Sequence, residues 1–112
     1  MENILIIVNR NGMGHGEPEL PQKLMVSYFN QLLSGNRLPS MIGFYGEGVQ
    51  LTVSGSPVLE ALSALAVKGV KIRSCTTCLN FYGILDRLKV GEAGTMQQIV
   101  EAQWNADKVI TL

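Results

Sequence analysis

Two cysteines in a Cys-x-x-Cys pattern, Cys75 and Cys78, are the residues of this sequence whose type and spacing most directly indicate chemistry. They are the only cysteines in the chain. Residues 69–72 before them are typical of a β-strand, whereas residues 79–83 after them can begin a helix. A cysteine at such a turn lies near free backbone N–H groups, which together with the helix dipole favour the thiolate over the thiol. We therefore expect Cys75 to be a nucleophile at neutral pH.

Persulfide chemistry is one reaction that such a pair can perform. Cys75 would accept a sulfane sulfur, and the N–H groups of the helix start would hold the persulfide anion as they hold other anions. Cys78, three residues later, could resolve the persulfide by attacking its inner sulfur, which releases sulfide and leaves a disulfide between the two residues.

Other roles for the two cysteines stay open. The same spacing suits a redox switch that forms a reversible Cys75–Cys78 disulfide. Both side chains can also act as small buried hydrophobes in a non-catalytic binding or assembly subunit. Zinc is disfavoured because a structural zinc site takes about four ligands, and beyond the cysteines the chain has a single histidine, His15. We expect no metal and no cofactor.

Four further residues are candidates for supporting a thiolate or an anion. His15 and the adjacent Gly14 lie in a glycine-rich loop, where the histidine could act as a proton donor or thiolate partner. Arg10 and Arg73 could stabilise the thiolate or attract an anionic donor. The simpler interpretations are a solvated histidine, glycines that permit a tight turn, and exposed arginines at strand ends. The loop has neither the G-x-G-x-x-G pattern nor a Walker lysine, so nucleotide binding is not expected.

Hydrophobic periodicity predicts the elements that position these residues. Strands are expected over residues 4–8, 41–45, 70–73, 87–90 and 108–112. Helices are expected between them, beginning near Pro18, Ser56, Cys78 and Thr95. Strands that alternate with helices form a parallel sheet covered on both faces. The predicted fold is α/β: a three-layer α/β/α sandwich with a mainly parallel sheet of four to five strands, in which residues 1–112 form a single domain.

The carboxyl ends of the strands are the edge at which parallel sheets form their sites. Three predicted loops lie at that edge, over residues 9–16, 46–48 and 74–78. The topology alone therefore places both cysteines where function is expected.

Composition limits the possible partners and the compartment. The net charge is zero, which argues against nucleic acid because such proteins carry a basic face. Charged residues make up 16% of the chain, against about 25% in a typical protein, so we expect part of the surface to be covered by self-association. No apolar run approaches a membrane span, and the N-terminus lacks the pattern of a signal peptide. A cytoplasmic location is expected, where two cysteines are more often reactive than disulfide-bonded.

Several segments together resemble a known family. These are residues 14–17, 48–56, 69–72, 75–83, 90–92 and 106–110. The Cys-x-x-Cys-Leu-x-x-Tyr-Gly segment is the most specific of them. With these residues the chain is similar to the DsrE/DsrF-like family of small sulfur-handling proteins. Within that family it most resembles the DsrE-like C-terminal domain of YedF-type proteins, which are sulfurtransferase-like and linked to selenium metabolism.

The resemblance implies a fold, an assembly and a role. It implies a three-layer DsrE-like fold and homo-oligomers, either trimers or hexamers. The family's sulfur-carrying cysteine corresponds to Cys75, eight residues before Gly83, whereas Cys78 has no counterpart in many members. The function implied is that of a sulfur carrier or sulfurtransferase that relays a persulfide, and a separate TusA-like sulfur carrier is a candidate partner.

Overall fold

A five-stranded sheet forms the centre of the computed structural model, which describes residues 2–112. The strand order is β4-β3-β2-β1-β5, and every neighbouring pair is parallel. The strands are β1 (Ile4–Val8), β2 (Met41–Phe44), β3 (Lys71–Cys75), β4 (Glu92–Gly94) and β5 (Lys108–Thr111). The helices are α1 (Glu19–Ser34), α2 (Leu59–Val67), α3 (Thr76–Phe81) and α4 (Met96–Asn105), with two 3₁₀-helices, η1 (Gly46–Thr52) and η2 (Leu85–Arg87). The predicted α/β class is confirmed.

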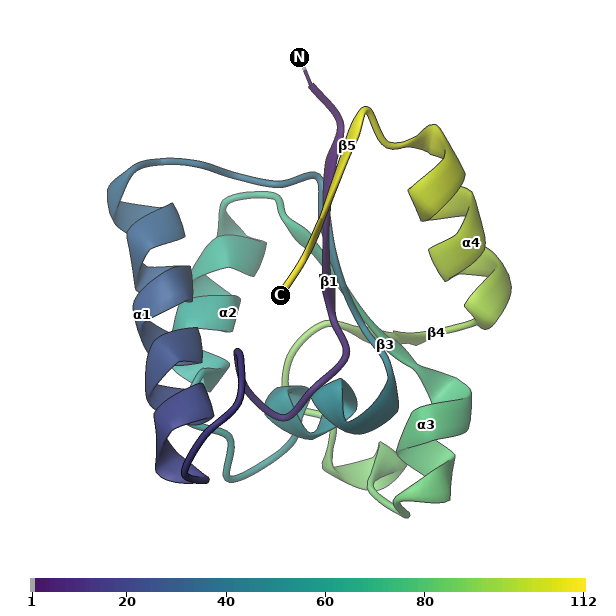
Figure 1. Cartoon of the computed structure of the whole chain (residues 1–112). Helices are drawn as coiled ribbons and strands as arrows, with labels where there is room; N and C mark the ends of the chain where they lie inside the picture. The colour runs from purple at the N-terminus through teal and green to yellow at the C-terminus, as the bar shows by residue number, and fades with distance from the viewer. Residues whose placement is uncertain (1) are drawn as a thin grey trace.

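Helices cover both faces of this sheet. α1 and α2 lie side by side on one face and α4 lies on the other, while α3 follows β3 directly at the carboxyl edge (Figure 1). Burial on both faces explains the apolar run of β1, since a strand covered on two sides selects apolar residues at every position. Leu5, Ile6 and Ile7 are each 1% exposed. Within residues 2–112, no helix has both the length and the apolarity to cross a membrane.

The bounds of α1 follow local signals in the sequence. Met25, Phe29 and Leu32 recur at helical spacing and are the buried residues of this helix. The helix ends at Ser34, and two residues later Asn36 adopts a positive φ of 52°. Asparagine tolerates this left-handed conformation, which commonly terminates helices. The helix end predicted at this point is confirmed.

The fourth strand differs from the prediction. Residues 87–90 do not join the sheet, and only Leu88 forms an antiparallel bridge, to Val53. The sheet instead takes Glu92–Gly94 as β4, which pairs with the end of β3. Gly91 separates the two segments: its φ is +74°, and a Cβ there would overlap the carbonyl of Ile72. The prediction failed because glutamate, alanine and glycine have low strand propensity, so the real strand carries almost no local signal.

Candidate functional site

The two cysteines lie at the strand-to-helix turn that the sequence predicts. Cys75 is the last residue of β3 and the N-cap of α3, with extended backbone angles of φ −62° and ψ 121°. Cys78 lies one turn into α3. Both cysteines are free thiols.

Cys75 does not have the solvent access that a nucleophile was expected to have. It is 1% exposed and belongs to the hydrophobic core. The physical reason is that the strand runs two residues further than its apolar pattern indicates, so Cys75 is still part of the covered sheet. Cys78 is partly exposed and packs against the same core. Cys78 is therefore the more accessible thiol, although the sequence argument for a reactive cysteine was stronger for Cys75.

Cys78 receives a hydrogen bond from a loop far away in the sequence. The Gly46 N–H donates to the Cys78 Sγ at 3.1 Å. Burial raises the pKa of the Cys78 thiol, the Gly46 N–H acts in the opposite direction, and the adjacent Cys75 side chain raises the pKa again. The net direction is upward, so Cys78 is a neutral thiol at pH 7. The activated thiolate expected from the helix start was assigned to Cys75, and the raised pKa concerns Cys78 alone.

A buried pair of hydroxyl groups holds η1, and with it Gly46, against β3. Thr52 and Ser74 are 0% and 1% exposed, and their Oγ atoms lie 2.9 Å apart. The Thr52 hydroxyl donates to the Val49 carbonyl at 2.8 Å, so the Ser74 hydroxyl must donate to Thr52. This contact joins the end of η1 to the residue before Cys75.

The residues predicted to support the thiolate fall into two places. Arg10, Gly14 and His15 line a shallow hollow beside the glycine-rich loop. The Arg10 Nη1 donates to the His15 Nδ1 at 2.9 Å, which places the ring proton of a neutral His15 on Nε2. Arg73 forms an ion pair with Glu92 at 3.1 Å across β3 and β4. Within the part of the chain that the structure describes, no hydrogen bond or ion pair joins any of the four to a cysteine.

The predicted meeting of three loops at the carboxyl edge does occur, through η1. Gly46 contacts Cys78, and the neighbouring Glu47 accepts the Asn11 N–H of the glycine-rich loop at 3.4 Å. Gly48 packs so closely under the end of β1 that a Cβ would overlap the Val8 carbonyl. Two closely spaced glycines after a strand were the sequence signal for this contact, but they do not reveal its partner.

The residues that the structure describes contain no group of three or more His, Cys, Asp or Glu side chains arranged to hold a metal ion. The two thiols together with one loop histidine fall short of a structural zinc set, which takes about four ligands.

Comparison with known proteins identifies relatives by sequence and by structure. The DsrE/DsrF-like family matches residues 13–112. The fold is similar to that of the YchN protein from E. coli, with a TM-score of 0.70, 22% identity and full coverage of both chains. It is also similar to MTH1491 from Methanobacterium thermoautotrophicum, described as a protein of unknown function, with a TM-score of 0.74, 18% identity and full coverage of both chains.

A third structure with the same fold is BT1422 from Bacteroides thetaiotaomicron, a conserved protein of unknown function. The TM-score is 0.64 at 18% identity, over 98% of this chain and 95% of that one. Comparison with curated proteins gives no match. Structural likeness at such low identity shows a shared fold alone, whereas the family match covers most of the chain. The chain therefore belongs to the DsrE/DsrF-like family.

Proposed function

We propose that this protein accepts a sulfane sulfur, holds it as a persulfide on the Cys75–Cys78 pair and relays it to a partner. Membership of the DsrE/DsrF-like family supports a role in sulfur relay. The observation that carries the proposal is the pairing of two free thiols at the carboxyl edge of the sheet, one of which accepts a backbone N–H at 3.1 Å.

The different exposure of the two cysteines supports an order of steps. Cys78 is the thiol that a donor reaches first: its thiolate attacks the sulfane sulfur, and the rest of the donor leaves with the electron pair of the broken S–S bond. The Cys75 thiolate then attacks the outer sulfur of the Cys78 persulfide, which transfers that sulfur to Cys75 and releases Cys78 as a thiolate. Neither step consumes an oxidant or a reductant. Burial of Cys75 then shields the stored sulfur from small reductants.

Mass spectrometry of the protein after loading with sodium polysulfide tests this proposal. The wild type should gain one sulfur atom, and peptide mapping should locate it on Cys75. Cys78→Ser should load at least tenfold more slowly, and Cys75→Ser should hold the sulfur on Cys78, where cyanide removes it faster. A wild type that gains no sulfur would refute sulfur carriage, whereas unchanged loading of Cys78→Ser would refute the order of steps.

A dithiol redox switch is the second candidate, and the proximity of the two free thiols favours it. Oxidation would join Cys75 and Cys78 in a disulfide and transfer two electrons to an oxidant such as glutathione disulfide. Equilibration in glutathione buffers of graded potential, followed by alkylation and mass measurement, tests this role. A midpoint far outside the cellular range of glutathione potentials would exclude it.

Homo-oligomerisation into trimers or hexamers is part of the same proposal. Three apolar residues recur every four positions on α4 and lie on its exposed side: Met96, Val100 and Trp104, with exposed fractions of 51%, 43% and 86%. Such an apolar stripe on the solvent-facing side of a helix is typical of an interface. Light scattering after size exclusion should give a trimeric or hexameric mass, which Trp104→Glu lowers and which Asn105→Asp, an exposed change of the same charge on another side of α4, does not. A monomeric wild type would contradict assembly.

A separate TusA-like sulfur carrier is the proposed exchange partner, in a cytoplasmic setting that suits two free thiols. Transfer of ³⁵S from the loaded protein to a purified TusA-like carrier tests the relay. Repeated rounds of transfer by one protein molecule would make it a sulfurtransferase, whereas a single transfer per loaded cysteine would make it a stoichiometric carrier.

A further inference from the structure

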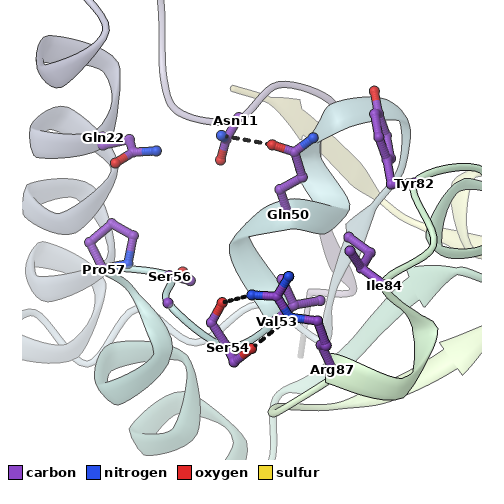
Figure 2. Close-up of a pocket in the computed structure, with 11 residues that line it drawn as sticks. Asn11, Gln22, Gln50, Val53, Ser54, Ser56, Pro57, Tyr82, Ile84 and Arg87 are labelled. Atoms are coloured by element: carbon purple, nitrogen blue, oxygen red, sulfur yellow. Dashed lines mark hydrogen bonds between the residues drawn. The ribbon is translucent and has the colours of Figure 1, made fainter.

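A polar pocket of about 330 Å³ lies where η1 and the segment after α3 meet, and neither cysteine lines it. Gln22 of α1, Gln50 of η1 and the turn after η1 form part of its wall, and the segment after α3 closes it with Ile84 and Arg87 (Figure 2). Tyr82, one helical turn after Cys78, also lines it. The pocket therefore shares η1 with the cysteine site, and the rest of its wall includes the segment that follows the cysteine helix.

The chemistry of the lining favours a negatively charged ligand. Its side chains include one guanidinium, from Arg87, and three carboxamides, from Asn11, Gln22 and Gln50. Two serine hydroxyls add further donors, and no carboxylate is among the lining residues. The hollow carries a net positive charge surrounded by neutral hydrogen-bond donors, which is the usual composition of an oxyanion site.

The guanidinium of Arg87 is fixed before any ligand arrives. Its Nε donates to the Ser54 Oγ at 3.0 Å and its Nη2 to the Ser54 carbonyl at 3.4 Å. The backbone is held as well, because the Ser54 N–H donates to the Arg87 carbonyl at 3.0 Å and the Lys89 N–H to the Thr52 carbonyl at 2.9 Å. Two of about five N–H donors of the guanidinium are used in this way. The remaining donors are available to a ligand, and little side-chain entropy is lost on binding.

The opposite wall is also ordered. The Asn11 Nδ2 donates to the Gln50 Oε1 at 2.9 Å, which fixes both carboxamides across the mouth of the pocket (Figure 2). The Gln50 Nε2 is thereby left as a donor. A rigid cation on one side and an oriented amide on the other give two points of contact for one small ligand.

We infer that this pocket binds a small oxyanion, with Arg87 as the charged contact and Gln50 as the amide contact. The ligand class is a free carboxylate or a sulfur oxyanion of similar size, since the two present the same negatively charged oxygens. The site does not depend on sulfur carriage by the cysteines. A sulfur oxyanion held here would be bound near the segment that follows the cysteine helix, whereas a carboxylate would act as a regulator or as part of a larger substrate.

Nuclear magnetic resonance titration of the ¹⁵N-labelled full chain tests the inference. Thiosulfate, sulfate and acetate are added separately at constant ionic strength, which separates the two sources of the ligand. At least one anion should give saturating amide shifts confined to the segments that line the pocket, around residues 11, 22, 50–57 and 82–88. Shifts that do not saturate, or that spread over the surface lysines, would overturn the inference.

Two variants with a matched control make the test specific. Arg87→Gln should weaken binding at least tenfold, about the effect of losing one charged hydrogen bond. Gln50→Glu leaves the Arg87–Ser54 contacts untouched, so it tests the site even if Arg87→Gln fails to fold. It should weaken binding at least as much, because the added carboxylate repels the anion. The exposed Gln103→Glu on α4 carries the same change in charge and should bind as the wild type does. Equal binding by wild type and Gln50→Glu would refute the site.

Sulfur carriage and anion binding can fail separately. Cys75→Ser/Cys78→Ser removes both thiols and should bind the anion as tightly as the wild type. Loss of binding in this double variant would assign the anion to the thiols instead and overturn the inference.

Discussion

Removing the Thr52 hydroxyl should destabilise the protein by about 2–4 kcal/mol, because the change leaves a buried donor without an acceptor. Thr52→Val keeps the shape of the side chain but removes the oxygen that bonds Val49 and Ser74. The Ser74 hydroxyl, 1% exposed, then loses the one acceptor found for it among the described residues. An orphaned buried hydroxyl costs about 1–3 kcal/mol, and a lost hydrogen bond about 1 kcal/mol more.

A double-mutant cycle separates this contact from simple changes of packing. Ser74→Ala should cost only about 1 kcal/mol, since Thr52 keeps its bond to the Val49 carbonyl. The double variant contains no orphaned hydroxyl, so it should be more stable than the sum of the single changes predicts, by about 1 kcal/mol.

Urea unfolding at 25 °C measures these free energies, and hydrogen exchange at Gly46 reports on the site. Loosening η1 should speed exchange of the Gly46 amide, whose N–H is bonded to the Cys78 Sγ. Thr77→Val, an exposed change on α3, serves as the control and should stay within about 0.5 kcal/mol. Additivity of the two single changes within about 0.5 kcal/mol would refute the reasoning.

Three further predictions concern the site and the sheet. Alkylation of Cys78 should still rise about tenfold per pH unit between pH 7 and 8.5, because its raised pKa leaves the thiolate scarce there; a plateau of the rate below pH 7 would contradict the raised pKa. Gly91→Ala should cost about 2–4 kcal/mol in unfolding free energy, since a Cβ meets the Ile72 carbonyl in a left-handed backbone. Gly83→Ala, whose positive φ is similar but whose surroundings are open, should cost only about 1–2 kcal/mol. Arg73→Gln removes an exposed ion pair and should change the free energy of unfolding by less than about 1 kcal/mol at 0.15 M salt. The change should be smaller still at 1 M salt, because salt screens exposed charges. A larger change in urea unfolding would show that the ion pair has a strong structural role.

The burial of Cys75 bears on how sulfur could be handled here. A stored persulfide needs protection from solvent as much as it needs access. In the proposed relay, two thiols of different exposure would divide these tasks: Cys78 would meet the donor and the buried Cys75 would be shielded. The raised pKa of Cys78 makes its thiolate scarce at neutral pH, so a donor or partner that supplies a positive charge near Cys78 would speed loading.

Local sequence signals predicted most of the fold correctly. The strand at residues 4–8, the helix after Pro18 and the helix start at Thr95 all form as expected, and at the last of these Thr95 and Gln98 make a capping box. These features depend on residues within a few positions of one another. The β4 strand was missed because its three residues have little strand propensity and owe their conformation to pairing with β3.

The candidate site was predicted in position but not in environment. The placement of Cys75 at the end of β3 follows from a local pattern of strand and helix. The grouping of Arg10 with His15, and of Arg73 with Glu92, was not foreseen, since each pairing depends on where the loops and strands meet. The pocket beside Arg87 had no sequence motif at all, because its lining comes from four separate segments.

The amino-acid sequence by itself determined the alternation of strands and helices, and hence the edge of the sheet at which two cysteines would lie. Tertiary structure alone decided which thiol is exposed, which one Gly46 reaches from 32 positions away, and which charges are already paired. The physical reason is range: hydrophobic periodicity and capping act between neighbours along the chain. Burial, pKa and pockets depend on the dielectric and the donors that distant segments bring to one place.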